Sequence, residues 1–266
     1  MTRVRDPKRV ALLLVVMCGA IVSAQRGGGR GGPGGQGGPP QDPKAAAPID
    51  VTGYWVSIVS EDWRYRMVTP TKGDYQGVPM TPDAVKIADA WDPAADTAAG
   101  NQCKSYGAAA IMRVPGRVHI TWDDDRTLKL DADAGTQTRV FRFDAPAGAG
   151  QARAKGEPSW QGDSVAQWET PGGRGGANAP RTGALKVVTT NLKAGYLRKN
   201  GVPYSEAATV TEYFDVVRGR NGDTLLVVTT VVDDPKSLRQ PFIVSSQFKK
   251  QADAKGWEPT PCSSTW

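Results

Sequence analysis

The sequence predicts an all-β fold, an antiparallel meander that closes into a barrel, with one short helical insertion near residues 81–99. Roughly nine or ten runs rich in β-branched and aromatic residues are divided by turn signals at hairpin-like spacing. Short connections predict antiparallel pairing, because parallel strands need long crossovers. Both faces of Leu225–Val232 are apolar or threonine, so this strand is covered on both sides or lines an apolar cavity. A closed up-and-down barrel removes edge strands and offers such a cavity.

The chain of 266 residues is expected to have three parts. Residues 1–24 are typical of a secretory signal peptide, because basic residues precede the apolar run Val10–Val22 and small residues end at Ala24. Residues 25–48 predict a flexible Gly/Pro-rich linker, since they have almost no apolar side chains to offset the entropy of ordering. Residues 49–266 are expected to form a single β-barrel domain.

These features predict an exported protein, periplasmic or extracellular, whose linker can tether the domain to the cell envelope. The first apolar run is too short for a membrane span, and no later stretch qualifies. A lipid anchor at Cys18 is the alternative. A lipobox has a small residue before its cysteine, whereas Met17 stands there, so the unlipidated form is favoured.

The charge of the expected mature domain argues against nucleic-acid binding. The whole chain has a formal charge of +6. Residues 1–24 hold four basic residues and one acid, and residues 25–44 hold three and one, so the remainder has a charge of +1. A nearly neutral domain has no electrostatic footprint for a polyanion, and no nucleic-acid partner is expected.

Two cysteines remain after the expected cleavage, Cys103 and Cys262. In an oxidising compartment an even pair predicts a disulfide, here one that ties the C-terminal tail to the domain. Two buried free thiols are the alternative. The two cysteines and the single histidine, His119, lack the ligand spacing of a zinc site, so neither a metal nor another cofactor is expected.

The first part of the domain is expected to contain two extended runs and the clearest helix. Val51–Val59 predicts a first strand, and Arg64–Val68 a short extended run. Thr81 is a good N-cap residue with Pro82 at the first helical position, and Asp92-Pro93 stops the helix. One or two helical turns follow before Gly100. This alanine-rich insertion is expected to pack across one end of the barrel.

The remaining strands follow from alternation and turn signals. In Arg117–Trp122, His119 lies on the face opposite Trp122. Asn221-Gly222 is the strongest signal for a two-residue hairpin. The expected strands after the first are 117–122, 127–130, 136–143, 164–169, 184–192, 209–217, 224–232 and 242–249. Acidic residues occupy two of the turns without the spacing of an EF-hand, which argues against a calcium site.

Several short motifs resemble those of a family of secreted bacterial β-rich proteins of unknown function. They read W-x-G-x-S…W-E from Trp160, L-x-V-x-T from Leu185, G-x-P-x-S-E from Gly201, V-x-E-x-F from Val210, and D-P…P-F from Asp234. The resemblance covers nearly the whole domain. It implies a lipocalin/calycin-like barrel, and Gly53-x-Trp55 echoes the start of such barrels. The family has no established catalytic residues, so the resemblance adds little about chemistry.

Acidic residues are the main candidates in this sequence for catalytic or ligand-binding groups. No Ser-His-Asp order is present, and Gly162-Asp-Ser164 lacks the second glycine of a nucleophile elbow. Glu212 lies in phase with Val210 and Phe214, the apolar face of its strand. An inward acid needs a partner or a shifted pKa. Either Arg64 or Arg66 is the expected partner. A Glu–Arg network for binding and an ordinary structural salt bridge are both consistent with this pattern.

The favoured function is a non-enzymatic binding module for a small, partly apolar ligand held in a barrel cavity. A hydrolase or isomerase with paired carboxylates, Glu169 and Glu212, is the first alternative. An envelope interaction or assembly protein with an exposed strand edge is the second. The candidate ligand-binding residues are Arg64, Arg66, Trp122, Trp168, Glu169, Tyr204, Glu206, Glu212 and Phe214.

Overall fold

The computed structural model describes residues 42–143, 156–170 and 182–265. The expected signal peptide, Cys18 and residues 25–41 of the expected linker lie outside the described residues. Residues 42–48, which the sequence assigns to the linker, contact the barrel instead. The indole Nε1 of Trp168 donates to the carbonyl oxygen of Pro43 at 2.8 Å.

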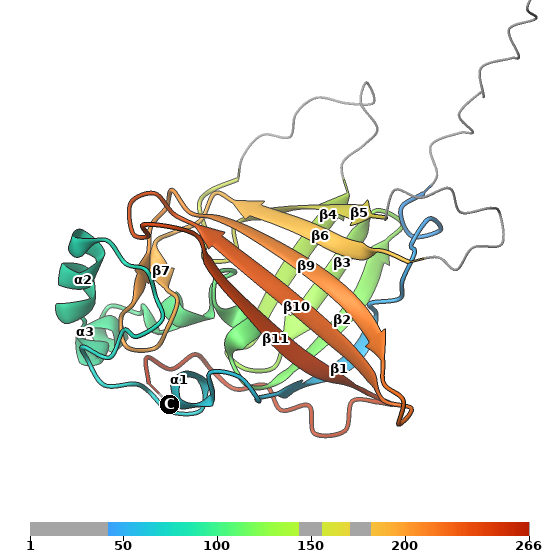
Figure 1. The fold of residues 1–266 in the computed structure, drawn as a ribbon, viewed down its shortest axis with the longest axis horizontal. Coiled ribbons are helices and arrows are strands. Elements are labelled where there is room, and N and C mark those ends of the chain that lie inside the picture. The colour runs from blue at the N-terminus through green and yellow to red at the C-terminus, as the bar shows by residue number, and fades with distance from the viewer. Residues whose placement is uncertain (1–41, 144–155, 171–181, 266) are drawn as a thin grey trace, which may run out of the picture. The chain divides into compact units, whose positions relative to one another are not determined.

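The fold is a closed β-barrel of nine strands (Figure 1), as the sequence predicts. Around the barrel the strands follow the order β1, β11, β10, β9, β6, β5, β4, β3 and β2, which returns to β1. A separate two-stranded sheet joins β7 to β8. The strands are β1 Gly53–Ile58, β2 Arg117–Asp124, β3 Thr127–Ala132, β4 Gln137–Phe143, β5 Asp163–Glu169, β6 Ala184–Thr190, β7 Gly195–Tyr196, β8 Pro203–Tyr204, β9 Thr209–Arg218, β10 Thr224–Asp233 and β11 Phe242–Gln251.

One barrel pairing departs from the expected antiparallel pattern. Strands β4 and β5 are parallel, with Phe141 opposite Ser164. Residues 144–162 separate the two strands in the sequence. A parallel pair requires the chain to return to the end where β4 began, which a hairpin loop cannot do. The expectation of a purely antiparallel meander is therefore wrong at this pair, and the barrel is mixed.

The expected extended run Arg64–Val68 is also wrong, because residues Trp63–Arg66 form the short helix α1. Asp62 adopts a left-handed backbone at φ 50°, and the N–H of Tyr65 donates to its carbonyl oxygen at 2.8 Å. The buried Arg66 side chain then forms an ion pair with Glu61. Arg66 Nε also donates to the carbonyl oxygen of Arg113, 47 positions away, at 2.8 Å, and this distant contact favours the helix over an extended chain.

Helices α2 and α3 lie with β7 at one end of the barrel (Figure 1), as expected for the alanine-rich insertion. Helix α2 spans Pro82–Asp89, and its N-cap residue Thr81 accepts a hydrogen bond from the N–H of Ala84. Helix α3 spans Pro93–Ala98 and begins after Asp92. The 3₁₀ helices η1 (Gln102–Tyr106) and η2 (Ile111–Arg113) follow. These elements form the cap of the barrel.

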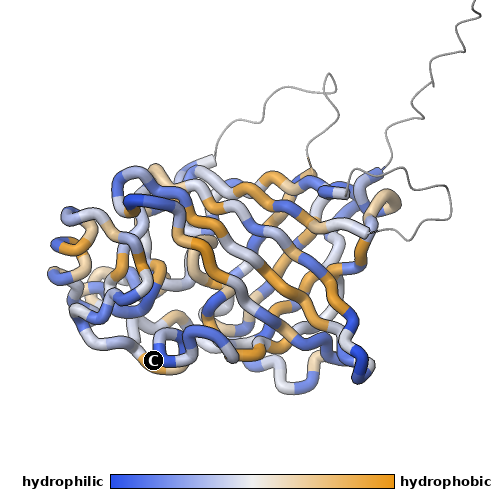
Figure 2. The backbone as a smooth tube through the Cα atoms, viewed as in Figure 1, coloured by the Kyte–Doolittle hydropathy of each residue, from blue (hydrophilic) through white to orange (hydrophobic). Residues whose placement is uncertain are grey.

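Two apolar clusters hold the domain together. The first fills the barrel with large side chains that are at most 1 % exposed, among them Trp55, Phe141, Phe214 and Phe248. The second lies under the cap and joins α2 to the residues around Tyr204, Val210 and Phe242. Apolar and polar segments alternate along the wall strands (Figure 2), because successive side chains point in and out.

Strand β10 shows how the wall differs from the sequence expectation. Its inward residues, from Leu226 to Val232, are buried, whereas its outward residues are half-buried on the wall. The strand is thus covered on one face only, not on both.

The hairpin between β9 and β10 differs from the expected two-residue turn at Asn221-Gly222. The two strands are paired, but the loop that connects them comprises residues 219–223. Gly222 has a positive φ and Asn221 does not, so a type I′ two-residue turn is not formed.

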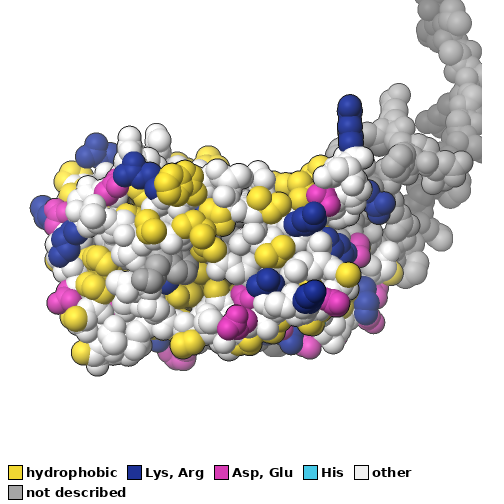
Figure 3. All heavy atoms as spheres, turned by 90° about the horizontal axis from the view of Figure 1, so that it is seen from below, with side chains coloured by type: hydrophobic (Ala, Val, Ile, Leu, Met, Phe, Trp, Pro, Cys, Tyr) yellow, Lys and Arg dark blue, Asp and Glu magenta, His cyan; other side chains and the backbone are white. Residues whose placement is uncertain are grey.

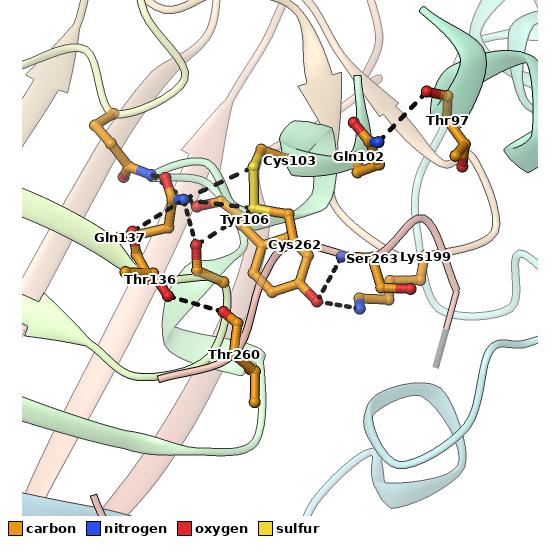
Figure 4. The surroundings of a disulfide bond; sticks show 12 residues. Thr97, Gln102, Cys103, Tyr106, Thr136, Gln137, Lys199, Thr260, Cys262 and Ser263 are labelled. Atoms are coloured by element: carbon orange, nitrogen blue, oxygen red, sulfur yellow. Dashed lines mark hydrogen bonds between the residues drawn. A yellow bond between two sulfur atoms is a disulfide. The ribbon is translucent and has the colours of Figure 1, made fainter. Parts of the chain in front are cut away.

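The disulfide between Cys103 and Cys262 is confirmed, and it joins residues 159 positions apart (Figure 4). It fastens the C-terminal tail to η1 beside the turn that precedes β4. Thr136 Oγ1 donates to the carbonyl oxygen of Thr260 at 2.9 Å, and the hydroxyl of Tyr106 accepts from the N–H of Ser263 at 3.3 Å. Chain-entropy models assign such a long loop a stabilisation of about 4–5 kcal/mol.

The surface is mixed in charge. Figure 3 shows acidic and basic side chains side by side on one face of the molecule. Among the residues that the structure describes, no helix combines the length and the apolar character that crossing a membrane requires.

Candidate functional site

A cavity of about 560 Å³ lies in the cap, outside the barrel interior. Helix α2, the β7–β8 sheet and the segment after β10 form its walls. Volumes of about 300–1,000 Å³ are typical of small-molecule sites. The cavity is lined by Asp83, Ala84, Ile87, Lys104, Ala194, Gly195, Tyr196, Pro203, Tyr204, Ser205, Glu206, Lys236 and Ser237.

Close backbone packing shapes this cavity. A Cβ atom on Gly195 would lie 2.6 Å from both the carbonyl oxygen of Lys104 and the hydroxyl of Tyr204, so only glycine lets β7 approach η1. Gly201 has a φ of +80°, and a side chain there would meet Trp91 at the end of α2. The chain between β7 and β8 is thereby held against the helical cap.

Asp234 fixes the wall formed by Ser205 and Lys236. One carboxylate oxygen accepts from the N–H of Ser205 at 2.6 Å, and the other accepts from the Ser205 hydroxyl at 2.7 Å and the N–H of Lys236 at 3.0 Å. Burial alone would raise the pKa of the Asp234 carboxyl, but these bonds and one from Ser237 hold it below the ordinary value of 3.8. The motifs ending in Ser205-Glu206 and beginning with Asp234-Pro235 therefore meet at the cavity.

The walls of the cavity are largely apolar, and its charged groups are already paired. Lys104 Nζ lies 2.7 Å from Asp96, and the hydroxyl of Tyr196 donates to the same carboxylate at 2.8 Å. Burial, with help from Asp96, raises the pKa of Tyr196, so its hydroxyl stays protonated. At the mouth, Glu206 and Lys236 form an exposed ion pair at 2.5 Å. Such a pair contributes little stability and leaves its groups open to a ligand.

A buried polar layer separates the cap cluster from the barrel cluster. Arg139 of β4 donates to both oxygens of Glu212, at 2.9 and 2.5 Å, and to Thr189 Oγ1 at 3.3 Å. The hydroxyls of Ser164 and Thr189 lie 2.8 Å apart. All four side chains are at most 5 % exposed. Along β9, Glu212 lies between Val210 of the cap cluster and Phe214 of the barrel cluster.

This layer also adjoins the floor of the cavity through Tyr204. Burial raises the pKa of the Tyr204 hydroxyl, and the nearby charge of Arg139 opposes that shift. The hydroxyl is buried without a hydrogen-bond partner among the described residues. Tyr204 thus lines the cavity with its ring, while its hydroxyl points into the packed interior near Gly107 and Gly195.

The structure brings only two of the expected ligand-binding residues to the cavity, Tyr204 and Glu206. Trp122 and Trp168 lie at the opposite end of the barrel, where both pack near Phe143. Phe214 fills the interior against Phe141.

The two expected partners of Glu212 lie elsewhere. Arg64 is exposed and pairs with Asp74, whereas Arg66 is buried and pairs with Glu61. The expected pairing of either with Glu212 is wrong, because Arg139 occupies that position.

Glu169 and Glu212 are not brought together. Glu169 lies on the outside of β5 and pairs with Lys186 at 3.0 Å, whereas Glu212 is enclosed in the barrel. The barrel wall separates the two carboxylates, so they do not form the acid and base of a single site.

Sequence reasoning missed Arg139 and most of the cavity. Arg139 alternates with Phe141 and Phe143 on the inward face of β4. Read together with the inward Glu212, that alternation would have identified the pair. The cavity residues come from five separate segments of chain with no common periodicity, so no local pattern gathers them.

Among the described residues, no group of three His, Cys, Asp or Glu side chains is arranged to hold a metal ion. No protein-family model, curated protein or solved structure matches the chain.

Glu212→Gln is expected to lower the free energy of unfolding by about 3–5 kcal/mol, because it leaves the Arg139 charge buried without its partner. The double variant Arg139→Met/Glu212→Leu removes both charges, so it is expected to be much closer to the wild type. Urea unfolding of the three proteins measures the difference. Equal losses in the single and double variants would contradict this account of the layer.

Asp234→Asn is expected to be less stable than the wild type at neutral pH, with the difference shrinking in acid. The lowered pKa of Asp234 means that its stabilisation is present above the unfolded value of 3.8 and is lost as pH falls through the still lower folded value. Melting temperatures between pH 7 and pH 3 measure this. A difference that stays constant over that range would show that ionisation of Asp234 does not matter.

Proposed function

We propose that this chain is an exported binding module for a small, partly apolar ligand, and that the ligand occupies the cap cavity. The observation that carries the proposal is the cavity itself, whose volume and mainly apolar walls suit such a ligand. The ring of Tyr204 and the side chains of Ile87 and Pro203 supply apolar surface. Ile87 is 55 % exposed, which leaves an apolar side chain at the cavity with surface to cover.

The polar groups suggest how the ligand is oriented. Glu206 and Lys236 at the mouth present one charge of each sign, and Asp83 adds a second acid from α2. A ligand with an apolar body and a polar end places the body against Tyr204 and the polar end at the mouth. This arrangement differs from the expected site within the barrel, where Phe214 and its neighbours occupy the space.

The two alternative functions receive less support. The wall of the barrel lies between Glu169 and Glu212, which disfavours paired-carboxylate catalysis. Each of the nine barrel strands has two neighbours, which disfavours assembly through an open barrel edge.

Export into the periplasm or the extracellular space is part of the proposal. The signal-like residues 1–24 support it, and the Cys103–Cys262 disulfide is compatible with an oxidising compartment. The resemblance to the secreted lipocalin/calycin-like family is in keeping with this location and stays a prediction, as does tethering through the linker.

Native mass spectrometry of the protein purified from its source is expected to show a retained small molecule, and 1-anilinonaphthalene-8-sulfonate serves as a probe of the same cavity. Ala194→Trp places a large side chain at an exposed position of the cavity wall. It is expected to weaken binding of the dye by about tenfold or more, since the ring takes the space of the ligand.

Ala252→Trp is the matched control, because Ala252 is also exposed but lies outside the cavity lining. This control is expected to bind the dye as the wild type does. Equal dye affinity in wild type and both variants, with no retained molecule, would contradict a ligand site in the cap.

A further inference from the structure

Three buried arginines converge on another, much smaller cavity, at the 3₁₀ helices of the cap. Arg66 belongs to α1, Arg113 to η2, and Arg198 to the segment after β7. Their exposed fractions are 2 %, 6 % and 4 %. All three line a cavity of about 20 Å³, together with Tyr65, Ser105, Ala110, Val114, Leu197 and Lys199.

Some of the N–H groups of each guanidinium donate hydrogen bonds that hold the side chain in place. Arg66 donates from Nε to the carbonyl oxygen of Arg113 at 2.8 Å and from Nη1 to Glu61. Arg113 donates from Nη2 to Asp62 at 3.2 Å. Arg198 donates from Nη1 to the carbonyl oxygen of Gln76 at 2.7 Å and stacks on the ring of Tyr65 at 3.9 Å. The three side chains are therefore fixed in place.

Each guanidinium group also has one buried nitrogen without a hydrogen-bond partner: Nη2 of Arg66, Nη1 of Arg113 and Nε of Arg198. Buried donors are nearly always satisfied, and those that are not call for an explanation. Three such donors around one cavity share a single explanation if an acceptor binds among them.

The electrostatics favour a negatively charged acceptor. The pKa of Arg113 is lowered to about 10, chiefly by burial and further by the charges of Arg198 and Arg66, while Asp62 opposes the shift. The three groups are thus close enough to repel one another, yet remain charged at neutral pH. Arg66 and Arg113 have ion pairs with Glu61 and Asp62, whereas Arg198 forms none within ion-pair distance among the described residues. The positive charges outnumber the carboxylates that contact them.

We propose that these three arginines bind one small monovalent inorganic anion of the size of chloride. The volume of the cavity limits the size of the anion that it can hold. A water molecule needs about 10–15 Å³ measured in this way, so 20 Å³ admits one particle slightly larger than water. A tetrahedral oxyanion, with five heavy atoms, is too large. The bound anion accepts from the free N–H groups and links α1, η2 and the chain after β7.

The test compares sodium chloride with sodium gluconate at constant ionic strength, using the whole chain. Chloride is expected to raise the melting temperature by about 3–5 °C for each tenfold rise in concentration above its dissociation constant. Arg198→Gln is expected to abolish this chloride-specific shift. Arg64→Gln, a change at the exposed arginine of the same helix as Arg66, is the matched control and is expected to retain it.

A direct measurement covers the case in which Arg198→Gln does not fold. Crystals of the wild type grown in sodium bromide are expected to give an anomalous peak within hydrogen-bond distance of all three arginines. Two results would overturn the proposal: no peak there, or equal melting temperatures in chloride and gluconate. Loss of the shift in Arg64→Gln would also overturn it, because the effect would then follow surface charge.

Discussion

The ion pair between Arg139 and Glu212 constrains the rest of this structure. Both side chains are almost completely removed from water, and the pair is stable only because its geometry is bidentate and Thr189 takes a further N–H. Those requirements fix the register of β4, β6 and β9 relative to one another. The pair also divides the interior, with an apolar cluster in the barrel on one side and another under the cap on the other.

This division explains what the sequence motifs do. Ser164, Thr189 and Glu212 come from three different motifs, and all three belong to the polar layer around Arg139. Ser205 and Asp234 come from two others and fix a wall of the cap cavity. The motifs thus specify a filled barrel and a shaped cap. The barrel is the scaffold, and the cap cavity of about 560 Å³ lies at one end of it.

Much of the fold could be predicted from the sequence, because alternation along the strands and the caps of α2 are local signals. The disulfide could also be predicted, since only two cysteines follow the expected signal peptide. The parallel β4–β5 pair and helix α1 could not, because a long connection decides the first and the contact of Arg66 with the distant Arg113 favours the second. The inward position of Glu212 was readable from its strand, whereas its partner Arg139 is 73 positions away. The cap cavity could not be predicted for the same reason, because segments that are distant in the sequence meet there.

The central claim is that the buried pair supports the scaffold while the ligand site lies in the cap. Binding of 1-anilinonaphthalene-8-sulfonate by the folded double variant Arg139→Met/Glu212→Leu tests it most directly. The dissociation constant is expected to equal that of the wild type, because both substitutions lie beneath the cavity and not in its lining. A double variant that keeps its stability but no longer binds the dye would contradict the account and place the site in the barrel interior.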